Sequence, residues 1–199
     1  MKTRIIILLC IILITNILTA QNNNGSKEDS AFFVKGISNS KIYTKEEADK
    51  GNEYELENGK IVFYFDQLGV AFYFKTETSK TLILTEFTVG KESDGEISWE
   101  KDNIIYQIGL HDFNDDNLYE LVIAVKDKDE YFSGVELNIF KYIPFDKKWE
   151  IIGTTKRKDI SGEPIALVDK DRIKIERNFR GFYSEWILSD GKFKIIHED

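Results

Sequence analysis

A run of oxygen-bearing side chains between two apolar stretches is the part of this sequence best suited to chemistry. Side chains that carry oxygen occur at Asp112, Asn114 and Asp116, two residues apart, and at Glu120, four residues after the last of these. A tight loop with this spacing turns its acceptors towards one point, and the backbone carbonyl of Leu118 adds a further oxygen. Hard oxygens, several of them charged, are the ligands that Ca²⁺ prefers. The spacing therefore predicts a structural Ca²⁺ site made by these five residues.

The sixth position of the predicted loop bears on the same hypothesis. Calcium loops of this kind usually hold glycine there, because the chain turns sharply. Here the residue is Asn117, and asparagine is among the side chains that best tolerate a left-handed backbone. The alternative interpretation is a solvated acidic turn, in which Asp and Asn serve turn geometry alone.

The segment from Asp112 to Val122 also resembles a known calcium loop. It reads Asp-Phe-Asn-x-Asp-x-x-x-Glu-Leu-Val, which is similar to the Asp-Phe-Asn-x-Asp-Gly-x-x-Asp-Leu form of FG-GAP and VCBS repeats. The resemblance implies ligand roles for Asp112, Asn114, Asp116 and Glu120, although the family prefers Asp at the last position. It also implies a blade of a β-propeller in an exported or cell-surface protein. The motif occurs once, whereas a propeller needs several blades, so the resemblance extends to the loop and not to a whole propeller.

The elements that must position this loop are predicted to be β-strands. Short runs rich in aromatic and β-branched residues recur along the chain. The expected strands are 61–65, 70–74, 81–89, 104–110, 121–125, 135–140, 149–155, 165–168, 172–176, 182–188 and 192–196. The run 135–140 alternates apolar and polar residues as a half-buried strand does, and Asp190-Gly191 predicts a tight hairpin turn. We expect an antiparallel β-sandwich or a propeller-like stack of sheets, with an open sheet that carries a helix as the alternative.

One short helix is predicted near the N-terminus of the folded part. Thr44 followed by Glu47 forms a capping-box pattern, and the helix would end near Gly51. The aromatic residues, 14 Phe, 9 Tyr and 3 Trp, are expected mainly in the core of the sheets and less in a sugar-binding face.

The first 20 residues predict an export signal. Lys2 and Arg4 precede a short apolar run, and Thr19-Ala20 supplies small residues before a polar stretch. We expect cleavage after residue 20, a flexible tether over 21–31, a single β domain over 32–199 and a periplasmic or secreted location. The apolar run is shorter than the roughly 20 residues a spanning helix needs. The large residue Leu9 precedes Cys10, which lies inside the apolar run and so does not fit a lipoprotein signal.

Removal of the signal changes the chemistry available to the mature chain. Cys10 leaves with it, which excludes disulfides, thiolate metal sites and a cysteine nucleophile. Without Lys2 and Arg4 the basic residues fall from 27 to 25 against 35 acidic residues, so the net charge moves from −8 to about −10. Such a charge disfavours nucleic acid and anionic membrane and suits cations or a basic protein partner.

Other catalytic patterns are weak. The two histidines, His111 and His197, are far apart in the sequence, so a zinc site would need both together with carboxylates. His111, next to Asp112, could act as a general base, but no recognisable motif in the sequence supplies a nucleophile for it to activate. The sequence favours an exported, non-catalytic binding module such as a periplasmic inhibitor or immunity-type protein, with a basic toxin or lytic enzyme as partner. The alternatives are a cell-envelope module of the FG-GAP type that binds glycan or protein, and a hydrolase that uses carboxylates.

Overall fold

The computed structural model of the 199-residue chain describes its β-rich part. The described residues are 32–44, 52–65, 69–87, 91–93, 96–98, 104–128, 133–160, 165–176 and 182–199. The chain divides into two compact units, 1–32 and 33–199, and all the described strands belong to the second unit. Within these ranges the structure consists of strands and turns, and no helix there is long and apolar enough to cross a membrane.

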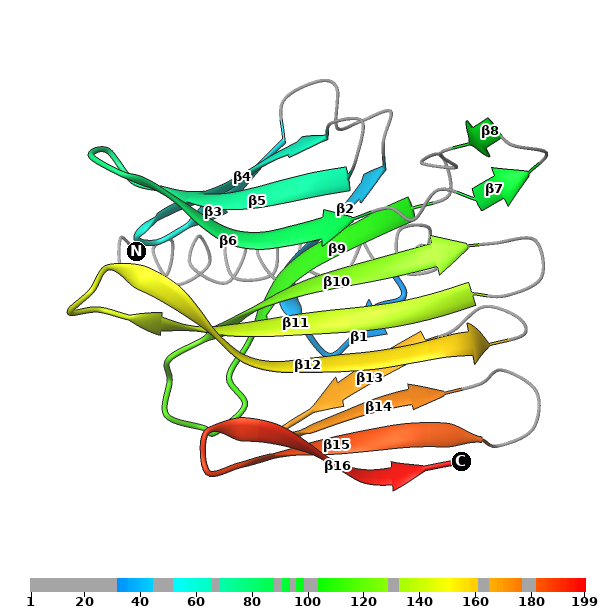
Figure 1. The fold of residues 1–199 in the computed structure, drawn as a ribbon. Coiled ribbons are helices and arrows are strands. Elements are labelled where there is room, and N and C mark those ends of the chain that lie inside the picture. Colours follow the sequence, from blue (N-terminus) through cyan, green and yellow to red (C-terminus); the bar gives the residue numbers. More distant parts are fainter. Residues whose placement is uncertain are drawn as a thin grey trace, which may run out of the picture. The chain divides into compact units, whose positions relative to one another are not determined.

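A five-stranded antiparallel sheet, sheet B, carries the predicted calcium loop (Figure 1). Its strand order is β12-β11-β10-β9-β2. The strands are β2 (Ser38–Thr44), β9 (Ile104–His111), β10 (Glu120–Lys128), β11 (Ser133–Ile143) and β12 (Lys148–Ile160). In β10 the four residues from Leu121 to Ala124 are all fully buried. Because successive side chains of a strand point to opposite faces, sheet B must be covered on both faces.

Sheet C covers one face of sheet B. It is a four-stranded meander of β3 (Glu53–Leu56), β4 (Gly59–Phe65), β5 (Gly69–Lys75) and β6 (Lys80–Phe87). Buried residues of both sheets form a cluster that we call the aromatic interface: Tyr43, Tyr54, Ile61, Phe63, Val70, Phe72, Phe74, Tyr106, Ile108, Leu121, Ile123 and Phe140.

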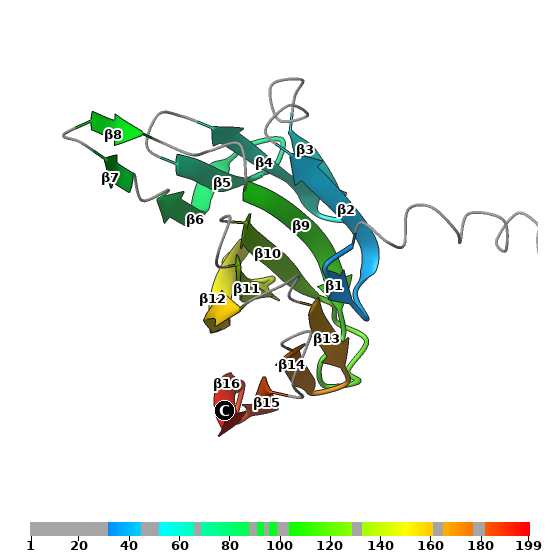
Figure 2. The ribbon, with the colours of Figure 1, turned by 90° about the vertical axis from the view of Figure 1, so that its right-hand side faces the viewer.

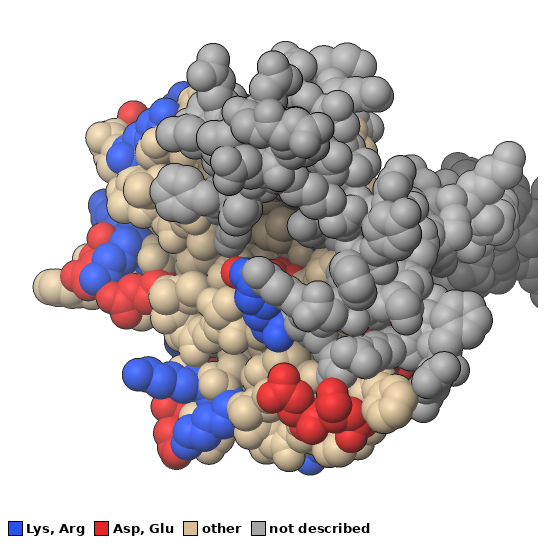
Figure 3. Space-filling model, turned by 45° about the vertical axis from the view of Figure 1, so that its right-hand side comes forward, with Lys and Arg blue, Asp and Glu red and all other residues tan. Residues whose placement is uncertain are grey.

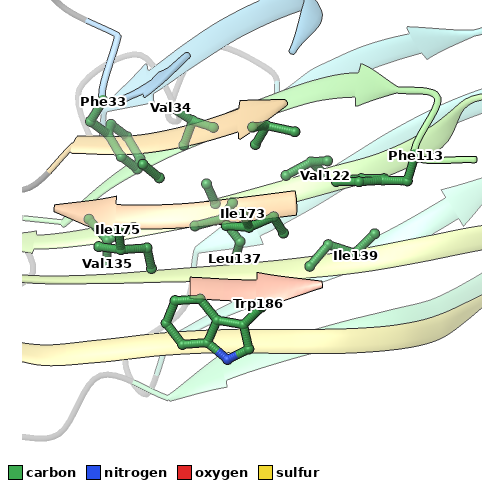
Figure 4. Packing of buried hydrophobic residues seen from close by; sticks show 13 residues of the cluster. Phe33, Val34, Phe113, Val122, Val135, Leu137, Ile139, Ile173, Ile175 and Trp186 are labelled. Carbon is green, nitrogen blue, oxygen red and sulfur yellow. The ribbon is translucent and has the colours of Figure 1, made fainter. Parts of the chain in front are cut away.

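Sheet A covers the other face of sheet B. It contains β1 (Val34–Lys35), β13 (Ile165–Asp169), β14 (Arg172–Glu176), β15 (Tyr183–Ser189) and β16 (Lys192–Glu198) in that order. The contact between sheets A and B, which we call the aliphatic interface, is formed by Phe33, Val34, Phe113, Val122, Ala124, Val135, Leu137, Ile139, Ala166, Val168, Ile173, Ile175 and Trp186. Figure 4 shows side chains from the two sheets pointing towards one another across this interface.

The three sheets therefore lie in layers with sheet B in the middle, as the turned view shows (Figure 2). None of them closes into a barrel, since each sheet has two distinct edge strands. The remaining strands, β7 (Lys91–Ser93) and β8 (Glu96–Ser98), form a separate two-stranded sheet.

The first strand is held in place by a buried glutamine. Gln107 of β9 is fully buried, and its Oε1 accepts hydrogen bonds from the backbone N–H groups of Phe33 and Val34 at 3.0 and 2.9 Å. Its Nε2 donates to the carbonyl of Val34 at 2.7 Å and to the hydroxyl of Ser40 at 2.8 Å. Two residues after Val34, Gly36 has a φ of 89°, and a Cβ there would lie 1.8 Å from the carbonyl oxygen of Val168. The chain can therefore leave β1 in this direction only with glycine at position 36.

The predicted mainly β class is confirmed, and so are the predicted strands within the described residues, which leave out positions 88 and 89 of the expected strand 81–89. The half-buried interpretation of residues 135–140 is wrong at Asn138, which is buried because sheet C covers that face. Asn138 is satisfied there by the hydroxyl of Thr154, which donates to its Oδ1 at 2.9 Å. Thr44, the predicted helix cap, is the last residue of β2, and residues 45–51 lie outside the described ranges. The predicted signal and tether, 1–31, lie outside them too.

Candidate metal loop between strands β9 and β10

The candidate loop is the connection between β9 and β10. His111 and Glu120 are paired across the two strands, so the ends of the loop are fixed by the sheet. All five sequence-predicted ligand residues lie in this loop or at its end: Asp112, Asn114, Asp116, Leu118 and Glu120. The five residues are close in the sequence, and the pairing of β9 with β10 fixes the two ends of the segment that carries them.

The backbone of the loop turns twice through the left-handed region. Asp115 has a φ of 56° and Asn117 a φ of 63°. The prediction that Asn117 takes a left-handed backbone is confirmed. Asparagine and aspartate are the non-glycine residues that adopt this conformation most readily, so the sequence supplies the required residue type at both positions.

The carboxylate of Asp112 organises the middle of the loop. Its Oδ1 accepts a hydrogen bond from the backbone N–H of Asp116 at 3.1 Å, and its Oδ2 accepts one from Asn117 at 2.8 Å. Asp116 in turn accepts a hydrogen bond from the backbone N–H of Leu118 at 2.7 Å and one from Nδ2 of Asn114 at 2.9 Å. These bonds, the backbone bond from Leu118 first, hold the pKa of Asp116 below its ordinary value.

Glu120 closes the loop from inside the protein. Only 1% of its surface is exposed, and its Oε2 accepts a hydrogen bond from the backbone N–H of Phe113 at 3.1 Å. Burial raises the pKa of the Glu120 carboxyl, and the bond from Phe113 and the charge of Lys141 act against that rise. A buried carboxylate with an elevated pKa is a group whose ionised form gains from a nearby cation.

Phe113 anchors the loop to the aliphatic interface. It is buried, and its ring lies 4.9 Å from the ring of Phe193 on β16 and 4.5 Å from the ring of His111. The aromatic residue between the first two predicted ligands thus ties the loop to sheet A as well as to sheet B.

A lysine that the sequence did not single out stands beside the loop. Nζ of Lys141, on β11, lies 3.6 Å from Oδ2 of Asp116. Lys141 lies next to Phe140, which pairs with Leu121, the residue after Glu120. The only sequence signal for this contact was the register of two strands, which is set by the whole sheet and not by the loop.

The two histidines have separate surroundings. The ring nitrogens of His111 lie 2.9 Å from the carbonyl oxygen of Gly36 and 3.0 Å from that of Lys170. The ring of His197, on β16, stacks on Tyr183 with 4.2 Å between centroids. His111 therefore lies between the segment after β1 and the β13–β14 turn, where both of its ring nitrogens contact backbone carbonyl oxygens.

The donor set of the loop fits a hard cation in its chemistry. It offers carboxylates from Asp112, Asp116 and Glu120, the amide oxygen of Asn114 and the carbonyl of Leu118. Over the described ranges, no three His, Cys, Asp or Glu side chains are grouped closely enough to hold a metal ion as they stand. The Asp carboxylates face the N–H groups of their own loop instead.

Comparison with known proteins identified no relative of this chain. No family model matches the chain, and neither the search of curated proteins nor that of solved structures found a match.

Proposed function

We propose that this chain is an exported, non-catalytic binding module of the periplasmic inhibitor or immunity type, with a structural Ca²⁺ ion in its β9–β10 loop. The observation that supports the calcium part is the conformation of the loop around Asp112. The carboxylate of Asp112 accepts hydrogen bonds from the backbone N–H groups of Asp116 and Asn117, and Asn117 has a left-handed backbone conformation. The four acidic residues from Asp112 to Glu120 carry a charge that a divalent cation would offset.

The residues of the loop have distinct parts in this proposal. Asp112, Asn114, Asp116 and Glu120 would hold the ion with side-chain oxygens, and Leu118 with its carbonyl. Glu120 would bind from the protein side, because its carboxyl is buried and fixed by Phe113. Bound calcium supplies positive charge that holds the loop in one conformation. The ion has a structural part here and takes no part in a reaction.

Thermal unfolding tests the calcium part. Calcium at 100 times its dissociation constant stabilises the folded chain by about 2.7 kcal/mol, which corresponds to a rise in Tm of about 5–10 °C for a domain of this size. Asp112→Ala and Asp116→Ala are expected to abolish this rise. Asp146→Ala, which removes an exposed carboxylate outside the loop, is the matched control and should keep it. Equal Tm values with calcium and with chelator would contradict the proposal.

The binding part rests on charge and on the absence of a nucleophile motif in the sequence. The chain has a formal net charge of −8 before processing, which favours encounter with a basic protein. Affinity purification of the tagged chain from its native envelope fraction is expected to yield a basic partner in a defined ratio. A chain that elutes alone as a monomer after such purification would count against the proposal.

A second candidate is a cell-envelope module of the FG-GAP type that binds glycan or protein. It is favoured by the order of the strands, because β3–β6, β9–β12 and β13–β16 are three successive four-stranded antiparallel meanders. Face-to-face stacking of such meanders is also how propeller blades pack, whereas two packed sheets would make a sandwich. This candidate predicts glycan or protein binding that disappears on chelation. Binding that survives chelation favours the inhibitor type.

A further inference from the structure

The described strands give sheets A, B and C six outer edges: β1 and β16, β12 and β2, and β3 and β6. An edge strand presents a row of unpaired backbone N–H and C=O groups, which can pair with a strand of another chain. β1 and β3 are short, with two and four residues. The other four edge strands have seven to thirteen residues and are therefore long enough to accept an added strand.

Each of the four long edges contains a β-bulge, and the extra residue always lies on the edge strand. On β6, Leu82 and Leu84 pair with consecutive residues of β5, so Ile83 is extra. In the same way Ile152 is extra on β12 and Ile196 on β16. On β2 three residue steps match two steps on β9. Over the described residues, the pairs between inner strands of these sheets show no register shift.

A bulge makes an edge a poor template for pairing. In a regular edge strand, alternate residues direct their backbone N–H and C=O groups outward, and an incoming strand must match that spacing. An extra residue interrupts the alternation, bends the strand and increases its twist. On β2 the bend is visible at Asn39, which has a φ of 50°. An added strand could therefore pair with the edge only on one side of the bulge.

Three of the bulges lie at pairs of aliphatic residues, Leu82-Ile83, Ile151-Ile152 and Ile195-Ile196. One side chain of each pair, at Leu82, Ile151 and Ile195, is 53%, 53% and 49% exposed. Exposed aliphatic residues on a flat, regular edge favour pairing between chains. Each bulge thus interrupts its strand at the place where pairing with a second copy would gain most.

These three edges lie along one side of the stack, one from each sheet (Figure 2). β12 and β16 approach each other closely, since a Cβ at Gly153 would lie 2.7 Å from Cβ of Phe193. Acidic and basic side chains are intermixed on the face shown in Figure 3, so charge there sets up no barrier of one sign against a second copy. Protection of the edges therefore depends on the backbone.

We propose that the bulges at Ile83, Ile152 and Ile196 form a device that prevents strand addition along this side, and so keeps the chain from pairing edge to edge with a second copy. The inference does not depend on the proposed function or on bound calcium. It assigns the extra residues a part that their side chains alone do not explain, because the bulge and not the chemistry of the side chain blocks the pairing.

Deletion of Ile196 tests the device, because it leaves the register on both sides of the bulge unchanged. His197 would still pair with Glu185, and Ile195 with Trp186, but no extra residue would lie between them. The deletion also removes a half-exposed aliphatic side chain, so any gain in association cannot come from added apolar surface. Ile196→Ser removes the same side chain and keeps the bulge, which makes it the matched control.

Sedimentation of the folded proteins over a range of concentrations measures the association. We expect the wild type and Ile196→Ser to keep the mass of one chain, and the deletion protein to reach about twice that mass or more. Amide hydrogen exchange should show new protection on β16 of the deletion protein as its concentration rises. Near-UV circular dichroism and Tm confirm that each protein is folded.

Three results would overturn the proposal. The first is a folded deletion protein that keeps the mass of one chain, and the second is Ile196→Ser associating as strongly as the deletion protein. The third is protection of β16 that increases with concentration in the wild type. Deletion of Ile83 makes β6 regular in the same way, and its association decides the question if the loss of Ile196 prevents folding.

Discussion

The two faces of sheet B are covered by different kinds of side chain. The aromatic interface with sheet C is built from seven Phe and Tyr residues and five aliphatic residues. The aliphatic interface with sheet A contains ten aliphatic residues and only Phe33, Phe113 and Trp186 as aromatic ones. The same central strands supply both interfaces, since Leu121 and Ile123 point one way and Val122 and Ala124 the other.

The difference shows two ways of joining sheets. At the aromatic interface the side chains reach across: the rings of Phe72 and Tyr106 lie 5.4 Å apart, and the hydroxyl of Tyr54 donates to the carbonyl of Asn39 on β2 at 2.9 Å. Rings carry both apolar area and a polar end, so they can join two sheets directly. At the aliphatic interface smaller side chains pack against one another, and a backbone connection adds to their packing, because β1 pairs with β13 and is also held by Gln107 of β9.

The largest expected effect is at the aromatic interface. Phe72→Ala removes a fully buried ring that contacts rings on both sheets. We expect the free energy of unfolding to fall by about 3–5 kcal/mol, measured by denaturant titration. Phe182→Ala, at a partly exposed phenylalanine, is the control and should change it by much less. Equal losses in the two variants would show that the aromatic interface is not well packed.

A smaller and more local effect is expected at the aliphatic interface. Gln107→Leu leaves the N–H groups of Phe33 and Val34 and the carbonyl of Val34 without their buried side-chain partner. We expect a loss of about 2–4 kcal/mol, which is below the sum of about 1–3 kcal/mol for each of the three groups because β1 can open and expose them to water. Amide hydrogen exchange should accelerate first at residues 33–35. Unchanged protection of those amides would show that β13 alone holds β1.

The smallest expected effect depends on pH. Tyr54→Phe removes one hydrogen bond between the two sheets and should cost about 1 kcal/mol near neutral pH. Burial raises the pKa of the Tyr54 phenol from 10.0 to about 12. The folded state therefore favours the neutral phenol, so the stability from this group is complete below pH 10 and is lost as the pH rises through about 12.

Denaturant titrations at increasing alkaline pH check this expectation. The wild type should lose stability between pH 10 and 12 more steeply than Tyr54→Phe. Tyr64→Phe, at an exposed phenol on the other face of sheet C, should retain the wild-type slope. Parallel curves for the wild type and Tyr54→Phe would contradict the assignment of the alkaline loss to Tyr54.

Local sequence patterns predicted most of the strands because those strands carry apolar residues at period two. They did not predict β2, whose sequence SNSKIYT contains few apolar residues, or β3, whose sequence EYEL alternates polar and apolar residues over only four positions. These strands form because neighbours pair with them, through β9 and β4. The half-buried interpretation of β11 was wrong for a related reason, since a polar residue such as Asn138 becomes buried only when a second sheet covers it.

The candidate loop was predictable in its residue types and its backbone, but not in its surroundings. Local rules identified Asn117 as a left-handed residue and Asp112 as an acceptor, because both depend on the loop alone. Burial of Glu120 and the ion pair between Lys141 and Asp116 depend on strand register and sheet stacking. These are set by distant parts of the chain.

The pairing of β1 with β13 sets an order of events for a chain synthesised from its N-terminus. Val34 pairs with Ala166, so the first strand has no partner strand until β13, at residues 165–169 of the 199-residue chain, has been made. The two meanders of sheets C and B consist of neighbouring segments and can assemble earlier, because contacts between close segments form faster. We expect docking of residues 33–35 to be the final step of folding. Until then residues 33 and 34 are held by the side chain of Gln107 without a paired strand.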